Sequence, residues 1–432
     1  MSQKSISFHT LGCRLNQSET AVIRRTFENN DYRVVEFSEP ADIVVINTCT
    51  VTRNGDTDTR KLVNKVAKRH PHSRIALIGC QAQVQKEKLA QHPNVRWVVG
   101  TEKKFDLIPI IEREHSDSKE CCVIIPRISK ESFTVPTAAI DRHKTRANLK
   151  IQDGCDFFCS FCEIPFARGR ARSREFDDIL TEAKTLADAG YQELVITGIN
   201  VGCYKNNSRT ILDVIEALEQ IEHVARIRIS SIEPTTIPIS LLPKMARHQK
   251  LCRHLHIPLQ SGSDVILQKM KRKYTTKEFC DFIHLAHETV SQICIGTDII
   301  VGFPGETEEC FRQTLELLEQ SPIHYFHVFS YSKRHSAQSR LLDDPVDTTV
   351  IQQRSKLLRD LGKKKRTTFH QSLVGTEQRV LIEEKKGEYL TGLTDNYVRV
   401  NIRSNASLTN QFVNLTLGEA TDKNVLGTMK EK

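Results

Sequence analysis

The chain has 432 residues, of which 39% are hydrophobic and 27% are charged, and its formal net charge is +9. This balance is typical of a globular protein with room for two or three domains, and it excludes a chain too short to bury a core. No run of about 18 apolar residues argues for a membrane span, and the N-terminus lacks a signal-peptide pattern. We therefore expect a cytoplasmic protein with no membrane partner.

The 13 cysteines are odd in number, which argues against a disulfide framework in a reducing compartment. Metal ligation or simple burial remains for each of them. A single cysteine is most often a small buried side chain, and we assign that role to Cys121, Cys122, Cys203, Cys252, Cys280, Cys294 and Cys310. The other six lie at the ends of predicted strands or in one compact loop.

The first hundred residues alternate between short apolar runs and helical patterns. Strands are predicted over 6–12, 42–47, 74–79 and 95–100, with helices over 16–30 and 55–69 and another after residue 79. Near-continuous apolar strands separated by helices indicate a doubly wound parallel sheet.

Three cysteines of this region, Cys13, Cys49 and Cys80, each lie at the C-terminal end of one of the first three predicted strands. Ligand sites in a doubly wound sheet collect beyond the C-terminal ends of the strands. We therefore expect the three thiols to meet at one cluster or metal site. The alternative is three unrelated buried thiols, which the same placement on successive strands disfavours.

Residues 116–140 carry few periodic signals, apart from a possible short strand at 122–126, and we interpret them as a linker. The linker separates an N-terminal domain (2–115) from a central domain (141–370). Six strands of the central domain are expected at 148–154, 193–199, 226–232, 254–260, 294–303 and 325–331, with helices between them such as 177–189 and 306–320, and a long helix at 347–370. This alternation predicts a partial or complete parallel barrel, whose active site lies at the C-terminal mouth of the strands.

Residues 371–432 follow a different pattern. Short strands are expected at 379–383, 387–394 and 397–402, with turn residues between them. The spacing predicts a small β-barrel, a shape often used to bind nucleic acid.

Three basic stretches favour contact with nucleic-acid phosphates. One is 353–366, with seven basic residues and one acidic residue; the others are Arg168, Arg170, Arg172 and Arg174, and Lys269, Lys271, Arg272, Lys273 and Lys277. Each stretch alone is equally explained by a solvated helix or loop face.

The spacing Cys155-x3-Cys159-x2-Cys162 places three thiols on one loop directly after a predicted strand. Three cysteines suit a [4Fe-4S] cluster with one iron left open, and that iron can chelate the amino and carboxylate groups of S-adenosylmethionine. A zinc site would need a fourth Cys or His nearby, and none follows Cys162 at a usual interval.

This loop resembles the radical S-adenosylmethionine superfamily, and the run QDGCDFFCSFCEIPFARGRARSR resembles its methylthiotransferase branch. The resemblance extends over essentially the whole chain, through GCRLNQSET (12–20), NTCTVT (47–52), GCQAQ (79–83), RISSIEP (228–234), HIPLQSGSD (256–264) and TDIIVGFPGET (297–307). The C-terminal barrel is similar to the TRAM domain of that branch.

The resemblance implies two [4Fe-4S] clusters, with Cys155, Cys159 and Cys162 holding the radical-generating one and Cys13, Cys49 and Cys80 holding an auxiliary one. In this branch the auxiliary cluster carries the sulfur that is delivered. One S-adenosylmethionine methylates that sulfur, and another is cleaved to a 5′-deoxyadenosyl radical that abstracts hydrogen from the substrate.

Contacts to S-adenosylmethionine are expected at the ends of barrel strands, and our candidates are Thr197, Gly198, Asn200, Ser230, Glu233 and Gly302. Gly198 and Gly302 have an alternative role as turn or close-packing glycines. His254 and His256 lie on one face of a predicted strand, where packing inside the barrel is as good an explanation as catalysis.

The side chains after Cys13 (NQSET) and after Cys49 (TVT) resemble the subgroup that acts on N6-threonylcarbamoyladenosine beside the tRNA anticodon. The alternatives are isopentenyladenosine in tRNA and an aspartate of a ribosomal protein. An alternative of another class is a non-catalytic Fe–S protein that binds RNA, which explains the charge and the terminal barrel but not the x3/x2 spacing. The expected partners are tRNA, an electron donor and a sulfur source.

Overall fold

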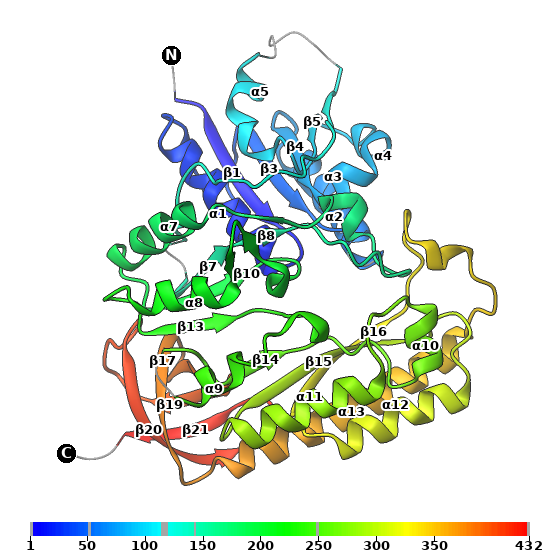
Figure 1. Cartoon of the computed structure of the whole chain (residues 1–432). Coiled ribbons are helices and arrows are strands. Elements are labelled where there is room, and N and C mark those ends of the chain that lie inside the picture. The colour runs from blue at the N-terminus through cyan, green and yellow to red at the C-terminus, as the bar shows by residue number, and fades with distance from the viewer. Residues whose placement is uncertain (1–2, 51–52, 114–119, 142–143, 248–249, 430–432) are drawn as a thin grey trace.

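Three sets of strands follow one another along the chain and occupy separate regions of the molecule (Figure 1). The computed structural model describes residues 3–50, 53–113, 120–141, 144–247 and 250–429, with residues 53 and 54 described as backbone only. Val51 and Thr52, which belong to the motif after Cys49, lie outside the described residues.

The N-terminal region is a parallel six-stranded sheet of order β2-β1-β3-β4-β5-β6. Its strands are β1 (Ser5–Thr10), β2 (Arg33–Val34), β3 (Ile43–Thr48), β4 (Arg74–Gly79), β5 (Val95–Val99) and β6 (Cys122–Ile124). Its helices are α1 (Arg14–Glu28), α2 (Arg53–Arg69), α3 (Cys80–Val84), α4 (Lys86–Ala90) and α5 (Leu107–Arg113). The predicted doubly wound sheet is confirmed.

Strand β3 shows why this sheet is covered on both faces. Ile43 and Val45 pack into a cluster with α1 and α5, whereas Val44 and Ile46 pack into a second cluster with α2 and α4. Successive side chains of a strand point to opposite faces, so a strand that is apolar at every position requires helices on both sides. Strand β6, inside the predicted linker, extends this sheet by pairing with β5; the domain boundaries themselves stay a prediction.

The central region contains all six predicted strands, arranged as two parallel three-stranded sheets. The first has the order β13 (Arg226–Ile229), β10 (Glu193–Thr197) and β7 (Arg146–Lys150), and the second has β14 (His254–His256), β15 (Cys294–Val301) and β16 (Tyr325–Ser330). The Cys252 amide donates to the Ile227 carbonyl at 2.9 Å, which joins the two sheets next to β14. No pairing connects β7 to β16 in the part of the chain that the structure describes, so the barrel is partial.

Helices lie on the outer side of this partial barrel (Figure 1). They are α7 (Phe176–Asp188), α8 (Ile211–Glu219), α11 (Thr276–Thr289), α12 (Glu308–Gln320) and α13 (Thr348–Ser372). On the open side, α1 of the N-terminal region packs against β7, where the Ser18 hydroxyl donates to the Asn148 carbonyl at 3.2 Å. The N-terminal region therefore covers one free edge of the barrel.

The C-terminal region is a closed barrel of order β17-β18-β19-β21-β20. Its strands are β17 (Glu377–Lys386), β18 (Tyr389–Thr394), β19 (Arg399–Arg403), β20 (Phe412–Ala420) and β21 (Val425–Met429). The predicted small barrel is confirmed and matches a TRAM domain, although β20 and β21 were not predicted.

This barrel docks where the central strands begin. Arg226, the first residue of β13, donates to the Leu393 carbonyl at 2.8 Å, and Arg228 donates to the Asp395 carbonyl at 2.9 Å. No helix of the described residues has the length and apolar character needed to cross a bilayer.

Candidate functional site

The loop with Cys155, Cys159 and Cys162 lies between β8 (Gln152–Asp153) and the short helix α6 (Ile164–Arg168). The Cys162 amide donates to the Cys159 carbonyl at 3.0 Å, which folds the loop back on itself. Burial raises the pKa of Cys155 to about 12, and the nearby Cys159 thiol adds to the rise. Burial also raises the pKa of Cys162, and both other thiols contribute. The three sulfurs are thus close enough to influence one another.

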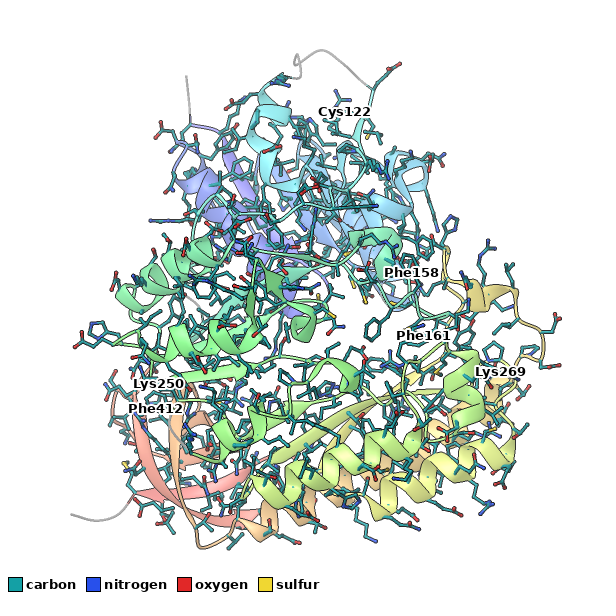
Figure 2. The ribbon with its side chains drawn as sticks, viewed as in Figure 1. Cys122, Phe158, Phe161, Lys250, Lys269 and Phe412 are labelled. Carbon is teal, nitrogen blue, oxygen red and sulfur yellow. The ribbon has the colours of Figure 1, made fainter. Side chains whose placement is uncertain are left out.

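An arginine lies beside this centre. Arg272 donates to the Cys159 sulfur at 3.3 Å and forms an ion pair with Glu233, one of the predicted S-adenosylmethionine contacts. Burial raises the pKa of Glu233, and Arg272 opposes the rise. Figure 2 shows Phe158 and Phe161 of the same loop between the N-terminal and central regions.

The second centre forms where three segments of the N-terminal sheet end. Cys13 is the N-cap of α1, Cys49 follows β3, and Cys80 is the first residue of α3. A Cβ atom on Gly12 would lie 2.6 Å from the Cys49 sulfur, so the first two segments touch. Asn16 holds them in place, because its amide donates to the Leu11 carbonyl at 2.8 Å and the Thr48 carbonyl at 3.1 Å.

Arg168 connects the two centres. Its side chain is fully buried, and its Nε donates to the Cys80 sulfur at 3.1 Å. Its other nitrogens donate to Glu19 at 2.9 Å, Asp153 at 3.0 Å and Asn16 at 2.6 Å. Burial raises the pKa of the Cys80 thiol, and Arg168 opposes that rise. Since Arg168 ends the helix that follows Cys162, one side chain links the loop of Cys155, Cys159 and Cys162 to the N-terminal centre.

A second link begins at the other end of α6. Glu163 accepts from the Thr50 hydroxyl at 2.9 Å and from Arg334 at 3.2 Å. Arg334 also donates to Thr50 at 3.0 Å and to Asp56 at 2.9 Å. Thr50 follows Cys49 and Glu163 follows Cys162, so these contacts join the residues next to one ligand of each centre. Sequence reasoning assigned no role to Glu163 or Arg334.

Both donor sets fit an iron–sulfur cluster. Each centre offers three cysteine sulfurs, the ligand set expected for a [4Fe-4S] cluster with an open iron. Each also has one arginine whose N–H donates to a sulfur, an arrangement that offsets thiolate charge. The assignment of the six cysteines as ligands stays a prediction that this geometry supports.

The predicted S-adenosylmethionine contacts divide into two groups. Glu233 lies close enough to Cys155 to raise its pKa, and the side-chain amide nitrogen of Asn200 is buried without a hydrogen-bond partner in the described residues. Gly198 packs against Gln152, where a Cβ would approach to 3.1 Å, and the Gly302 amide donates to Glu306 at 2.9 Å. Close packing explains glycine at Gly198, and at Gly302 a φ of +81° and a Cβ approach of 2.3 Å to Ile351 explain it.

The remaining candidates also use their polar groups within the fold. The Thr197 hydroxyl donates to the Val195 carbonyl at 3.0 Å, and the Ser230 amide donates to the Ile196 carbonyl at 3.0 Å. All six S-adenosylmethionine contacts stay predictions. His254 and His256 both point to the Tyr325 hydroxyl, at 2.8 and 3.1 Å, inside the barrel.

A cavity of about 1040 Å³ opens between the two regions that hold the cysteines. Gln81, directly after Cys80, lines one side, and Tyr331 and Arg334, beyond the end of β16, line the other. The cavity therefore lies beside the N-terminal centre and the mouth of the barrel, where a parallel barrel carries its active site.

The prediction that the arginines after the cysteine loop contact RNA phosphates is wrong for most of them. Arg168 and Arg174 are buried in ion pairs, and the Arg172 side chain is 8% exposed beside Glu102. Arg272 and Arg354, from the other two basic stretches, are buried in the same way. The other basic residues of these two stretches are mostly exposed, for example Lys269 (Figure 2), and their contact with RNA stays a prediction.

Two protein families match the chain. The Radical SAM superfamily matches residues 149–318, and a family described as Uncharacterized protein family UPF0004 matches residues 5–100. The first range contains the Cys155 loop, and the second contains Cys13, Cys49 and Cys80.

Named relatives cover nearly the whole chain. It is 35% identical to threonylcarbamoyladenosine tRNA methylthiotransferase MtaB of Bacillus subtilis (strain 168), over 96% of this chain and 94% of the relative. It is 36% identical to the protein of the same name from Aquifex aeolicus (strain VF5), over 91% and 96%. It is 31% identical to tRNA-2-methylthio-N(6)-dimethylallyladenosine synthase of Lachnoclostridium phytofermentans, over 99% and 96%.

Solved structures show the same fold at low sequence identity. The radical S-adenosylmethionine methyltransferase TsrM from Kitasatospora setae, with cobalamin and a [4Fe-4S] cluster bound, has a TM-score of 0.56 at 13% identity and covers 76% of this chain and 75% of its own. At this identity the likeness shows the fold alone.

Proposed function

The chain belongs to the radical S-adenosylmethionine methylthiotransferase family, and from this premise we propose that it adds a methylthio group to C2 of N6-threonylcarbamoyladenosine beside the tRNA anticodon. The observation that carries the proposal is the pair of three-cysteine centres joined by Arg168. Sulfur insertion needs a radical source and a sulfur source that face one substrate. Relatives named for this nucleoside are 33–36% identical to the chain, which supports the choice of substrate.

Clusters held by the two sets of three cysteines would supply the electron that cleaves S-adenosylmethionine and the sulfur that is transferred. The residues of the chain itself hold the two centres in position relative to each other. Arg168 and Glu163, at the two ends of α6, hold the cysteine loop against the N-terminal centre. Phe161 packs with Phe303 and Tyr331 in an apolar cluster, which keeps water from one side of the loop.

The same proposal includes the partners and the compartment. An enzyme that acts on tRNA meets its substrate in the cytoplasm, so we place it there. It also requires an electron donor for the radical cluster and a sulfur source that restores the auxiliary cluster after each turnover.

Nucleoside mass spectrometry of tRNA tests the substrate. Cells that lack the protein should lose the methylthio form of N6-threonylcarbamoyladenosine and keep that of isopentenyladenosine. The wild-type gene and a Cys280→Ala variant should restore the nucleoside, because Cys280 lies on α11 outside both centres. A Cys159→Ala variant should not. Loss of the isopentenyladenosine product alone would overturn the choice of substrate.

Anaerobic reconstitution separates the enzyme from a non-catalytic Fe–S protein that binds RNA. The reconstituted protein with S-adenosylmethionine and dithionite should form 5′-deoxyadenosine, and the Cys155→Ala variant should form none. Absence of 5′-deoxyadenosine from a protein with full iron content would contradict the enzyme assignment.

A further inference from the structure

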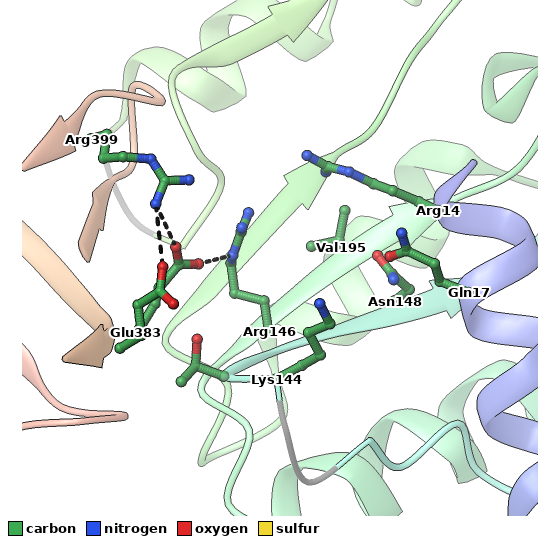
Figure 3. A pocket seen from close by; sticks show the side chains of 10 residues that line it. Arg14, Gln17, Lys144, Arg146, Asn148, Val195, Glu383 and Arg399 are labelled. Atoms are coloured by element: carbon green, nitrogen blue, oxygen red, sulfur yellow. Dashed lines mark hydrogen bonds and ion pairs between the residues drawn. The ribbon is translucent and has the colours of Figure 1, made fainter. Parts of the chain in front are cut away.

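A polar pocket of about 270 Å³ lies where the three regions of the molecule meet. Arg14 and Gln17 of α1 line one side, and Glu383 and Arg399 of the terminal barrel line the opposite side (Figure 3). The floor comes from the start of the central barrel, including Asn148 of β7. The pocket is therefore formed only when the N-terminal, central and C-terminal regions are assembled.

The charges of this pocket are not balanced. Arg146 and Arg399 both face Glu383, at 2.5 and 3.8 Å, so these two arginines have carboxylate partners. Arg14 and Lys144 form no ion pair with any carboxylate in the described part of the chain. Arg14 donates instead to the neutral hydroxyl of Tyr397 at 2.9 Å. Two cations without a counter-charge in a concave site favour an anionic ligand.

The pocket also lies close to the N-terminal centre of three cysteines. Arg14 directly follows Cys13, the exposed cysteine of the N-terminal centre. Val195 of β10 lines the pocket. Thr197 lies on the same face of that strand and is its last residue, toward the C-terminal mouth of the barrel. Because Cys13 is the N-cap of α1, a base bound at the N-terminal centre would lie beside the first turn of this helix.

We propose that this pocket binds the carboxylate of the threonylcarbamoyl group, with Arg14 and Lys144 as the cations that hold it. This inference rests on the proposed function. The planar guanidinium of arginine matches a carboxylate in a two-point contact, and Gln17 and Asn148 offer hydrogen-bonding groups of the kind that the hydroxyl and carbamoyl groups require. An isopentenyl group has no charge and would leave both cations unpaired. A phosphodiester of the tRNA backbone carries the same anionic oxygens and is the competing source.

Binding of three anticodon stem-loops to the anaerobically reconstituted enzyme tests the inference. The stem-loops carry threonylcarbamoyladenosine, its neutral methyl ester or isopentenyladenosine, and fluorescence anisotropy gives each Kd. We expect the wild-type enzyme to bind the acid about tenfold more tightly than the ester, the size of one charged hydrogen bond. Arg14→Gln and Lys144→Met should each reduce this preference and leave the Kd of the ester unchanged.

Two controls keep the result specific. Arg25→Gln changes an arginine on the same helix that is paired with Glu28 outside the pocket, and it should keep the wild-type preference. Iron content and 5′-deoxyadenosine formation show whether Arg14→Gln disturbs the cluster beside it, while Lys144→Met tests the same pocket at a residue that is not adjacent in sequence to any of the six cysteines.

Two outcomes would overturn the inference. If Arg14→Gln and Lys144→Met weaken the acid and the ester equally, with a smaller dependence of Kd on salt, the pocket binds a backbone phosphate. If both variants keep the full preference for the acid, the carboxylate binds elsewhere. In either case the wild-type enzyme would still methylthiolate the threonylcarbamoyladenosine stem-loop; failure of that reaction, with modification of the isopentenyladenosine stem-loop, would instead refute the proposed function.

Discussion

At the scale of single residues, Arg168 makes the contacts that join the cysteine loop to the N-terminal centre. It is a buried cation whose charge is matched by Glu19 and Asp153, and its Nε donates to the Cys80 sulfur. Burial tends to raise the pKa of the Glu19 carboxyl, but Arg168 and two lysines outweigh burial and hold that pKa well below its usual range. Removal of the arginine would break its buried ion pairs with Glu19 and Asp153 and its bond to Cys80 at once. The two carboxylates would keep fewer cationic partners, Lys150 among them, and breaking a buried ion pair is costly.

We therefore expect Arg168→Met to lower the free energy of unfolding by about 3–5 kcal/mol, and to lower the iron content of the N-terminal centre. Urea denaturation and iron analysis of the anaerobic protein measure the two effects. Arg170→Met is the matched control, because Arg170 is 52% exposed and its pair with Asp156 should contribute at most about 1 kcal/mol. Equal losses in the two variants would contradict the role of Arg168.

A second single residue, His324, should make the free energy of unfolding depend on pH. Burial lowers the pKa of His324 to about 3, and its Nδ1 accepts from the Ile295 amide at 3.0 Å. The unfolded chain binds the proton near pH 6.5, so the folded state loses stability as the pH falls from 6.5 toward 3. At pH 5 this loss is about 2 kcal/mol, from about 1.4 kcal/mol per pH unit.

The His324→Gln variant removes this titration and keeps an acceptor for the Ile295 amide. Urea denaturation at pH 7.5 and pH 5 should show a smaller loss of unfolding free energy for the variant than for the wild type. The exposed substitution His72→Gln should behave like the wild type. The same pH dependence in all three proteins would show that His324 does not titrate as expected.

At the scale of elements, α6 sets how the two centres face each other. The helix has five residues, and both ends of it are attached to the N-terminal centre through Glu163 and Arg168. Because residues at both of its ends contact residues of the N-terminal centre, α6 acts as a spacer that places the Cys155–Cys162 loop against that centre.

The Glu163→Gln variant should loosen this spacer without removing a cysteine. The amide keeps a hydrogen-bond acceptor for Thr50 but no charge for Arg334. We expect 5′-deoxyadenosine formation to continue while methylthiolated product falls about tenfold or more, since small misplacement of reacting groups costs that much. The ratio of methylthiolated product to 5′-deoxyadenosine measures this uncoupling. Glu309→Gln, on the exposed face of α12, is the control and should keep the wild-type ratio. A parallel fall of both products would contradict a spacer role.

At the scale of the whole molecule, the terminal barrel is bound firmly to the central region. Arg253 pairs with Asp395 at 2.6 Å, and Cys294 and Tyr325 of the central strands share a hydrophobic cluster with Val380 of the terminal barrel. Because the pocket beside Cys13 needs Arg14 and the terminal barrel together, docking of the barrel also completes that site.

A double-mutant cycle on Arg253→Ala and Asp395→Ala should give a coupling energy of about 1–3 kcal/mol in urea denaturation. Asp395 is buried, which tends to raise its pKa, but its hydrogen bond with Arg253 lowers the pKa of Asp395 to about 2. The pair is lost only as the pH falls through about 2, so the coupling should be the same at pH 5 and pH 7.5. The exposed pair of Lys386 and Glu384 should give at most about 1 kcal/mol; equal coupling in both cycles would contradict firm docking.

The sequence by itself determined the kind of fold and the kind of chemistry. Short continuous apolar runs and helical patterns are local properties, so the strands and long helices of the first two regions were predictable from them. The spacing from Cys155 to Cys162 is local too, and it defines a cluster loop without knowledge of the rest. The alternation of Val413, Leu415 and Leu417 is typical of a strand and marks β20, which was not predicted.

Only the tertiary structure decided which charged residues serve which site. The arginines after Cys162 have the same composition as an RNA-binding stretch, but Arg168 and Arg174 turn inward to meet acids distant in sequence or one turn away. Ion pairing between segments depends on packing, which local sequence does not encode. For the same reason, the link from Glu163 to Thr50 and the pocket shared by Arg14, Lys144 and Arg399 became visible only when three regions of the chain were placed together.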